Sequence, residues 1–339
     1  MSNPAPAEGL LPDRHQADFF VCDIFDAIPK DDLATMEHPI FSLSTKPDRR
    51  ILNYTHNGTD ITVVPSMRGL ATIHDKDILI FCISQLMAAL NAGRAVGRTL
   101  TLRAYDMLVA TNRETSGDAY RRLREAFERL AGTRITTNLE TGGMEVTSGF
   151  GLIENWEIVR RARGGRMVSV KVTLSEWLYR AVLSKSVLTL SRDYFRLRKP
   201  LERRVYEIAR KHCGRQPAWR ISVELLLKKT GSASPRRVFR KMLRDMIEAN
   251  HLPDYEMEEE AGDMIRFTRR TLIEDGPEAP PLSERAIEAA REILPGADVY
   301  ALEADWRAFW AASGRPKIRA ADAAFVGFVK MRAEKGGPR

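Results

Sequence analysis

Cationic side chains recur along residues 234–251, SPRRVFRKMLRDMIEANH, at a spacing that brings them to one side of a helix. Such groups bind phosphate, and arginine also pairs with the O6/N7 edge of guanine. Large apolar residues fall on the opposite side. We therefore predict a helix buried along one face, with Ser234 as its N-cap and Pro235 as its first residue. Its cations are Arg236, Arg237, Arg240, Lys241 and Arg244.

This helix is more uniformly basic than most surface helices, which mix glutamate with lysine. Like charges at i, i+4 repel by about a few tenths of a kcal/mol, and only Asp245 and Glu248 dilute the stripe. A solvated surface helix is the plain alternative. A negatively charged partner would turn the repulsion into attraction, so we expect this helix to face nucleic acid.

A second basic helix is predicted over residues 116–130, with Glu125 and Glu128 among its cations. Here a solvated face with i, i+4 ion pairs remains an equal alternative. Further cations lie on predicted hairpins, where they suit phosphate or minor-groove contact but also ordinary exposed turns. The helix carries Arg121, Arg122, Arg124 and Arg129, and the hairpins carry Arg163, Arg166 and Arg269.

Catalytic and cofactor signals are weak along the chain. The segment GRAVGRTLT (93–101) lacks the G-x4-G-K-[ST] pattern of a nucleotide-binding loop. The six histidines have no metal-ligand spacing, and no H-x-H pair occurs. A DNA strand-transfer enzyme with His212 and a Tyr255 nucleophile is an alternative that lacks the rest of a catalytic constellation. We expect no enzyme activity, no catalytic residue, no cofactor and no metal, and we interpret the acidic run 256–263 as a solvated hairpin end.

Composition agrees with a polyanionic partner: the 339 residues carry a net charge of +8, with 44% hydrophobic residues to build a core. No apolar run approaches the roughly 18–20 residues that span a bilayer, and the N-terminus lacks the pattern of a signal peptide. Three cysteines without a C-x-x-C motif favour a reduced, cytoplasmic protein.

The same order of elements occurs twice: helix, strand entering a helix, basic helix, hairpin. The first series runs from residue 75 to a hairpin at 133–149 that directly follows the basic helix, with a second long hairpin after it; the second series covers 199–270. This order is typical of a winged helix, whose third helix can enter the major groove. We predict an α+β fold of two tandem winged-helix domains with β-hairpin wings and a small helical appendage.

The predicted boundaries follow from composition. They are a flexible leader (1–17), an N-terminal winged-helix domain with extended strands (18–190), a C-terminal winged-helix domain (191–273), an acidic, proline-rich linker (274–282) and the appendage (283–339). The appendage should form its core from Trp306, Phe309 and Trp310.

Residues 38–91 closely resemble the bacterial plasmid replication initiator protein A family, most of all over VVPSMRGLATIHDKDILIF, and the resemblance extends to about residue 270. It implies a protein that binds repeated sequences (iterons) in double-stranded DNA at a plasmid origin, and that is therefore associated with nucleoid or plasmid in the cytoplasm. Such a protein would help open the origin and recruit the host initiator ATPase and replicative helicase. It further implies twin winged-helix domains, the C-terminal one making the main groove contact, and a possible homodimer that represses its own gene and controls copy number. A winged-helix transcriptional repressor is the main alternative.

Overall fold

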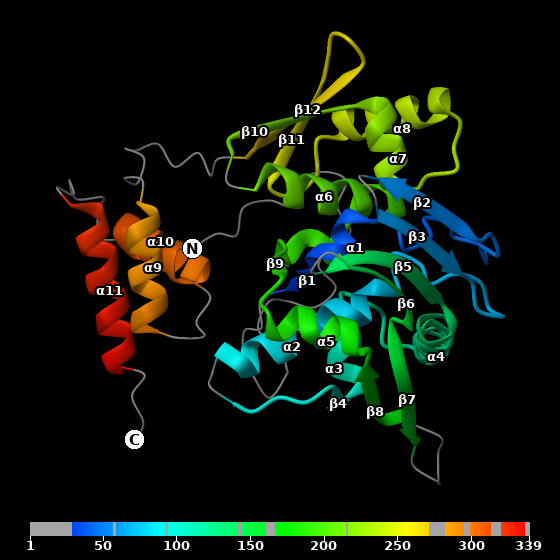
Figure 1. Cartoon of the computed structure of the whole chain (residues 1–339), viewed down its shortest axis with the longest axis horizontal. Helices are drawn as coiled ribbons and strands as arrows, with labels where there is room; N and C mark the ends of the chain where they lie inside the picture. Colours follow the sequence, from blue (N-terminus) through cyan, green and yellow to red (C-terminus); the bar gives the residue numbers. More distant parts are fainter. Residues whose placement is uncertain are drawn as a thin grey trace. The chain divides into compact units, whose positions relative to one another are not determined.

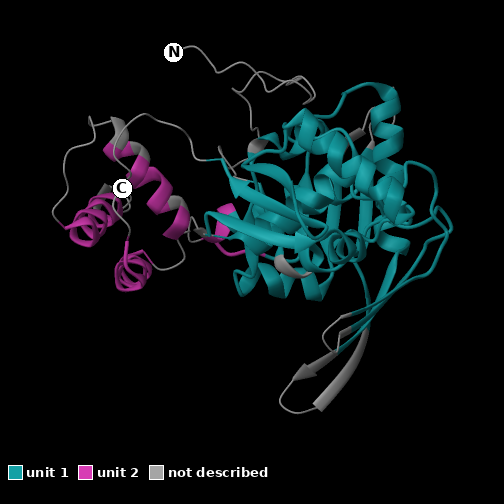
Figure 2. Cartoon of the chain, turned by 90° about the horizontal axis from the view of Figure 1, so that it is seen from above, with its two compact units in different colours: residues 1–87, 97–271 teal, residues 88–96, 272–339 magenta. Residues whose placement is uncertain are grey.

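In the computed structural model, the described residues are 29–56, 59–91, 94–141, 144–160, 167–214, 216–270, 282–294, 299–312 and 320–335. They divide into two compact units, residues 1–87 with 97–271 and residues 88–96 with 272–339 (Figure 2). In the described part of the chain, no helix is both long and apolar enough to cross a bilayer.

The second half of the first unit contains the strongly basic helix. Its elements follow in the order helix, strand, helix, helix, hairpin, and the hairpin strands pair with the first strand in the order β10-β12-β11 (Figure 1). The elements are α6 (Pro200–Cys213), β10 (Ala218–Ser222), α7 (Val223–Thr230), α8 (Arg236–Ala249), β11 (Tyr255–Glu260) and β12 (Met264–Arg269). Ser222 caps α7, and Gly231 ends it in the left-handed conformation that glycine tolerates.

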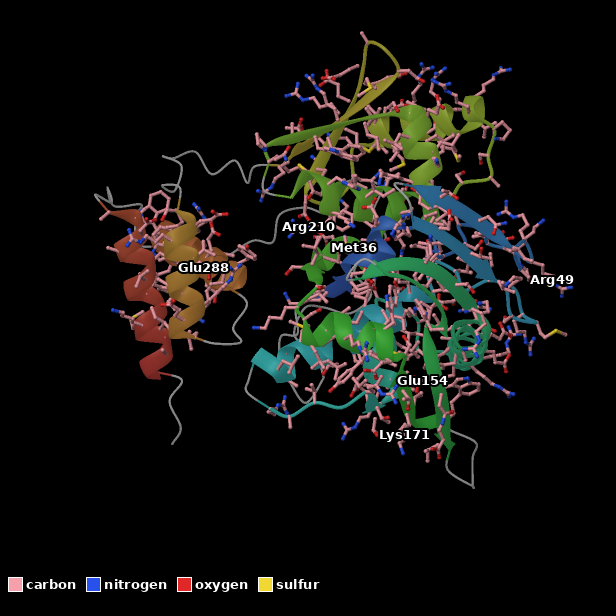
Figure 3. The ribbon with its side chains drawn as sticks, in the orientation of Figure 1. Met36, Arg49, Glu154, Lys171, Arg210 and Glu288 are labelled. Atoms are coloured by element: carbon pink, nitrogen blue, oxygen red, sulfur yellow. The ribbon has the colours of Figure 1, made fainter. Side chains whose placement is uncertain are left out.

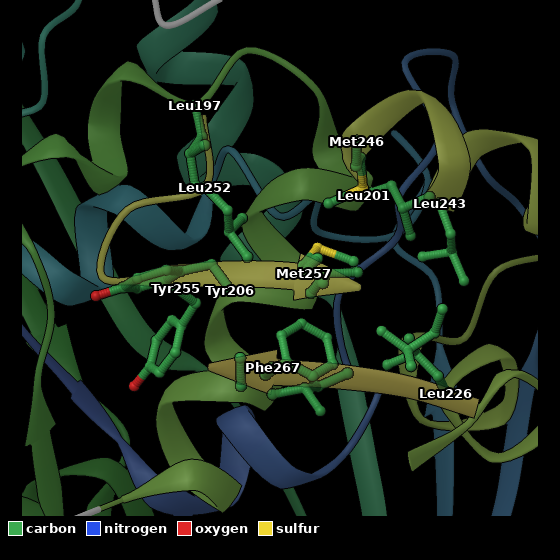
Figure 4. Packing of buried hydrophobic residues seen from close by; sticks show 14 of the residues in the cluster. Leu197, Leu201, Tyr206, Leu226, Leu243, Met246, Leu252, Tyr255, Met257 and Phe267 are labelled. Atoms are coloured by element: carbon green, nitrogen blue, oxygen red, sulfur yellow. The ribbon is translucent and has the colours of Figure 1, made fainter. Parts of the chain in front are cut away.

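One hydrophobic core holds this half together. Figure 4 shows Leu226 of α7, Leu243 of α8 and Met257 and Phe267 of the hairpin packed together, and Tyr206 of α6 belongs to the same cluster. The apolar alternation of the strands explains the arrangement, because every second hairpin residue turns toward the helices. Burial along Phe239, Leu243 and Met246 therefore orients α8 and leaves its basic side outward.

The first half repeats this plan with an insertion. Its helices and strands β4, β7 and β8 match the second half in order, and their sheet is β4-β8-β7. The elements are α2 (Lys76–Asn91), β4 (Thr99–Leu102), α3 (Ala104–Ala110), α4 (Gly117–Gly132), β7 (Ile153–Arg160) and β8 (Met167–Leu174).

The hairpin that directly follows α4 differs from the predicted wing. Strands β5 (Arg134–Thr141) and β6 (Met144–Gly151) pair with the earlier hairpin of β2 (Leu52–His56) and β3 (Thr59–Val64), in the order β2-β3-β5-β6. Val63 and Ile135 lie opposite each other in this sheet and are both buried. This apolar pairing holds the β5–β6 hairpin in the sheet with β2 and β3, so it does not pair with β4. Strand β8 of the β7–β8 hairpin pairs with β4 instead.

The remaining elements of this unit surround the contact between its halves. Strand β1 (Lys30–Asp32) pairs with β9 (Val187–Thr189), and the short helix α1 (Leu33–Glu37) packs against α6. Helix α5 (Glu176–Leu183), capped by Ser175, and a 3-10 turn (Arg192–Arg196) complete the connection.

Buried charges join the two halves. Lys76 Nζ of α2 lies 2.5 Å from Asp31 Oδ2 of β1 and 3.0 Å from Glu207 Oε2 of α6, and all three side chains are fully buried. Beside them, Arg203 Nη1 of α6 lies 2.5 Å from Asp77 Oδ1 of α2. We call these five residues the junction cluster. Its charges compensate one another across the contact, which fixes α6 of the second half against β1 and α2 of the first.

Arg204 closes the same contact through backbone groups. It is 2% exposed, and its guanidinium donates to the carbonyl oxygens of Thr35, Met36 and Glu37 at 3.0–3.2 Å and of Lys229 at 2.9 Å. Glu37 at the end of α1 in turn accepts from Lys211, His212 and Lys229. Burial raises the pKa of Glu37, but these hydrogen bonds outweigh it and hold the pKa well below its usual range.

Two histidines of the first half are expected to make the protein less stable in acid. Burial lowers the pKa of His74 to about 3, helped by Arg203 and Arg113, and burial also lowers that of His38 to about 4. Both values lie below the ordinary 6.5. The unfolded chain therefore binds more protons in this window, and stability is lost as the pH falls through it.

Urea unfolding at pH 7 and pH 5 measures this effect. We expect the wild-type chain to lose about 1–2 kcal/mol of stability through these two side chains, after allowance for their partial solvent contact. The double variant His38→Gln/His74→Gln should lose correspondingly less over the same interval. An identical pH dependence of the two proteins would contradict the assignment.

The second unit has a core of its own. Helices α9 (Glu284–Ile293), α10 (Val299–Ala312) and α11 (Ala321–Lys335) bury Ile287, Trp306 and Phe325 together. Ser283 caps α9 and also bonds Asp322. Trp306 and Trp310 are buried, but Phe309 is 55% exposed, so its predicted place in the core is wrong. Around the helix, Phe309 lies about 100° from Trp310, so it reaches only the edge of the core, where its ring contacts that of Phe328.

Candidate nucleic-acid interface

Helix α8 begins at Arg236, one residue later than predicted. Pro235 has an extended backbone with ψ 145°, and its carbonyl accepts the first helical hydrogen bond from Phe239 N at 2.9 Å. No side chain caps this end, so Ser234 is not the N-cap; its amide instead donates to Ser232 Oγ. The helix starts with its basic residues in its first turn, beside the turn that follows α7.

The cations of α8 fall into two groups with different partners. Arg237 and Lys241 are exposed and form no ion pair with any residue in the described ranges. On a helical wheel they lie almost opposite the buried Phe239 and Met246, so they form the outermost line of the helix. We call this line the outer ridge. The outer ridge thus carries two positive charges that are available to a binding partner of the helix.

The other three cations contact carboxylates of the hairpin β11–β12. Arg240 donates to Asp263 Oδ1 through Nε at 3.0 Å and Nη2 at 2.5 Å, and Arg236 bonds the other oxygen of Asp263. Arg244 is held by Glu259 at 2.7 and 2.9 Å. Bonds from Arg236 lower the pKa of Asp263, and bonds from Arg244 lower that of Glu259, so both carboxylates are ionised at neutral pH.

The acidic run of this hairpin is therefore not merely a solvated end, as its sequence suggested. Sequence reasoning missed Asp263 and Glu259 as partners of α8. The alternation of the strand could have predicted the side on which Glu259 lies. Met257 points to the core, and Glu259, two residues later, lies on the same side of the strand. No sequence pattern indicates the distance between the hairpin and the helix.

Helix α4 carries its arginines in local pairs. Arg121 and Arg122 contact Asp118, and Arg124 lies 3.2 Å from Glu128, all with more than half of each arginine side chain exposed. Exposed i, i+4 pairs of this kind are weak. These three arginines can exchange their partners at little cost, so the interpretation as a solvated face and that as a DNA contact both remain compatible with this geometry.

Arg129 of α4 has a different position. Its side chain is only 20% exposed and forms two hydrogen bonds, of 2.7 and 2.8 Å, with the buried Asp75 before α2. Asp75 also accepts from the backbone of Thr72. The arrangement ties α4 to the start of α2, which gives Arg129 a structural role, and we leave it out of the proposed interface.

The other predicted cations are only partly described. Arg269 at the end of β12 is exposed. Lys171 on β8, a further cation of the long hairpin, is also exposed, and Figure 3 shows it at one edge of the first unit. Arg163 and Arg166 lie outside the described residues. Arg270 bonds the carbonyl oxygens of Asn250, Leu252 and Tyr255, and so fixes the turn after α8.

The candidate nucleophile of a strand-transfer enzyme is not accessible. Tyr255 is 1% exposed and belongs to the core of the second half. Burial raises the pKa of its hydroxyl, so it is neutral at physiological pH. His212 stacks on Trp219 and contacts Glu37, away from the exposed surface of α8. Among the described residues, no group of three or more histidine, cysteine or acidic side chains could hold a metal ion.

In each half of the first unit, an exposed basic helix lies beside a three-stranded sheet, and comparison with known proteins gives the family. The model of the replication initiator protein A family matches residues 30–257, and the chain belongs to this family. The resemblance seen in the sequence is thereby confirmed. A protein of Wigglesworthia glossinidia brevipalpis described as a replication protein is 38% identical over 258 residues, 75% of this chain and 94% of the relative.

Solved structures show a related fold. Domains 2 and 3 of RctB superpose with a TM-score of 0.52 at 13% identity, covering 71% of this chain and 97% of that one. A second structure of these domains, RctB residues 155–483, gives 0.49 with 68% and 95% covered. The chain is thus a replication initiator with a mixed α/β fold like that of RctB domains 2–3.

Proposed function

We propose that this initiator binds double-stranded DNA in a sequence-specific manner at repeats in a replication origin, and that it catalyses no reaction itself. Each half of the first unit is interpreted as a winged helix: α8 enters the major groove, and α4 makes the second contact. The single observation that carries the proposal is the outer ridge of α8, where Arg237 and Lys241 stand exposed and unpaired among the described residues.

Position on the helix assigns the roles within the interface. Side chains on the outermost line of a helix in the major groove reach base edges, whereas side chains on its flanks reach phosphates. Arg237 is therefore the candidate for guanine contact, with Lys241 beside it. Arg121, Arg122 and Arg124 on α4 would bind phosphate after leaving their local carboxylates.

The contact between the halves supports a fixed geometry. The junction cluster and Arg204 connect α6 to β1, α1 and α2 by buried ion pairs and hydrogen bonds. Because this contact fixes the two halves, α8 and α4 are held at a constant separation. They could therefore bind two neighbouring segments of the same duplex. Family membership further favours recruitment of a host initiator ATPase and a replicative helicase, and self-association, as later steps at the origin.

Footprinting tests the proposal directly. DNA flanking the gene should contain direct repeats of about 20 base pairs, and the purified chain should protect two segments of each repeat about one helical turn apart. Supplying the gene in trans should restore replication of a plasmid that lacks its initiator. Protection without replication would favour a repressor, and no protection at low salt would reject DNA binding.

A further inference from the structure

The hairpin β11–β12 places two carboxylates against one flank of α8. Asp263 contacts Arg236 and Arg240, Glu259 contacts Arg244, and Glu224 of α7 lies 3.6 Å from Arg236, so the arginines at i, i+4 and i+8 each face a carboxylate. The outer ridge beside them has no such partners among the described residues. The same helix therefore combines one compensated flank with one charged ridge.

The positions of both carboxylates are set by the fold. Glu259 follows Met257 on the side of β11 that faces α8, whereas Glu258 lies on the opposite side and is exposed. Asp263 adopts φ 62° in the hairpin turn, a conformation that aspartate and asparagine tolerate. Its carbonyl oxygen accepts from Val223 N at 2.9 Å, which ties the turn to the start of α7.

The pairs are ordered but accessible. The arginine side chains are 35–61% exposed and the carboxylates 22–30%. Solvent-exposed ion pairs contribute little to stability, so a competing anion can replace the carboxylate. The carboxylates of Glu259 and Asp263 bind the Nε–Nη2 edge of Arg244 and Arg240, an edge that phosphate would also use.

We propose that Asp263 and Glu259 form an electrostatic screen that competes with DNA phosphates for the flank of α8 and lowers its affinity for arbitrary sequences. This rests on the proposed DNA binding by α8. On random DNA, the flank arginines stay with their carboxylates, and only the outer ridge contributes. At a cognate site, base contacts from the ridge hold the helix close enough for phosphates to replace the carboxylates. The screen thus widens the difference between specific and non-specific binding.

Three single variants of the full chain test this inference: Asp263→Asn, Glu259→Gln and the control Glu258→Gln. All are nearly isosteric and remove the same charge from the same hairpin, but only the first two face α8. Fluorescence anisotropy with a random 30-base-pair duplex should show about 3–5-fold tighter binding for Asp263→Asn and about 2–3-fold for Glu259→Gln. Glu258→Gln should stay within about 1.5-fold of wild type.

Salt titration supplies a second measurement. Each phosphate that an unscreened arginine gains should steepen the log–log slope by about 0.9, so Asp263→Asn should add about 1–2 to its magnitude. Binding to the footprinted repeat should change less than binding to random DNA. Unfolding curves show whether each variant is folded.

Equal effects of all three variants would overturn the screen, since the change would then follow net charge alone. Weaker or unchanged binding to random DNA by Asp263→Asn would also overturn it, because the carboxylate would then orient its arginines instead. If wild type and variants all fail to bind duplex DNA, DNA binding by α8 is itself rejected. Wild-type binding with unaltered variants rejects only the screen.

Discussion

The variant Lys76→Met is expected to lose about 3–5 kcal/mol of unfolding free energy, the cost of leaving buried carboxylates without their cation. Lys76 is 0% exposed and lies within 3.0 Å of both Asp31 and Glu207. Methionine fills most of the volume but carries no charge. The loss therefore reports the electrostatic role of the lysine rather than an empty cavity.

The pH dependence of that loss provides an internal check. Burial already raises the pKa of Asp31 to about 8, although the Lys76 ammonium opposes the shift. Without the ammonium, the pKa of Asp31 rises further. A carboxyl whose pKa is raised by folding makes the folded state less stable as the pH rises through that range. The difference between Lys76→Met and wild type should therefore be larger at pH 9 than at pH 7.

Urea unfolding of both proteins at the two pH values measures these differences, with Lys46→Met as the matched control. Lys46 is exposed, so its replacement should change the stability by less than about 0.5 kcal/mol. A Lys76→Met protein as stable as the control, or a difference that does not grow with pH, would contradict the role of the junction cluster.

The double variant Arg237→Ala/Lys241→Ala is expected to bind the footprinted repeat about 100-fold more weakly than wild type. A bidentate base contact contributes about 1–3 kcal/mol and each phosphate contact adds to it, so removal of both cations costs roughly 2–4 kcal/mol. Both side chains are exposed and point away from the core, so the fold should keep its stability. The magnitude of the log–log salt slope should fall by about 1–2.

A matched control separates this loss from the change in net charge. Lys46→Ala/Arg49→Ala also removes two exposed cations, but from the segment that precedes β2. It should bind within about 3-fold of wild type. Equal binding by the two double variants, measured by anisotropy on the same duplex, would remove α8 from the interface.

Helix α8 illustrates how far its sequence could be interpreted. The apolar spacing of Phe239, Leu243 and Met246 predicts both the helix and its buried face, and the structure confirms both. The outward position of Arg237 and Lys241 follows from the same periodicity. The periodicity does not predict the partners of Arg236, Arg240 and Arg244, because Asp263 and Glu259 lie 15–27 residues away along the chain.

Helix α6 illustrates what could not be predicted from the sequence. Its sequence, PLERRVYEIARKHC, is typical of an amphipathic surface helix, yet Glu202, Arg203, Arg204 and Glu207 are all at most 4% exposed. A charged residue can be buried only where an opposite charge or a hydrogen-bonding group meets it. For Arg203, Arg204 and Glu207 those groups come mainly from β1, α1, α2 and α7. For Glu202 they come from His251 after α8 and from Lys199. No local sequence pattern indicates the distant partners.

The sequence by itself determined the helices and hairpins, the repeated order of elements and the family, because these depend on short-range periodicity and on a long shared stretch of residues. Only the tertiary structure decided which hairpin lies beside β4, which arginines are compensated and which charges are buried. The physical reason is that ion pairs and strand pairing depend on distances in space, and the chain sets these only when distant segments pack together.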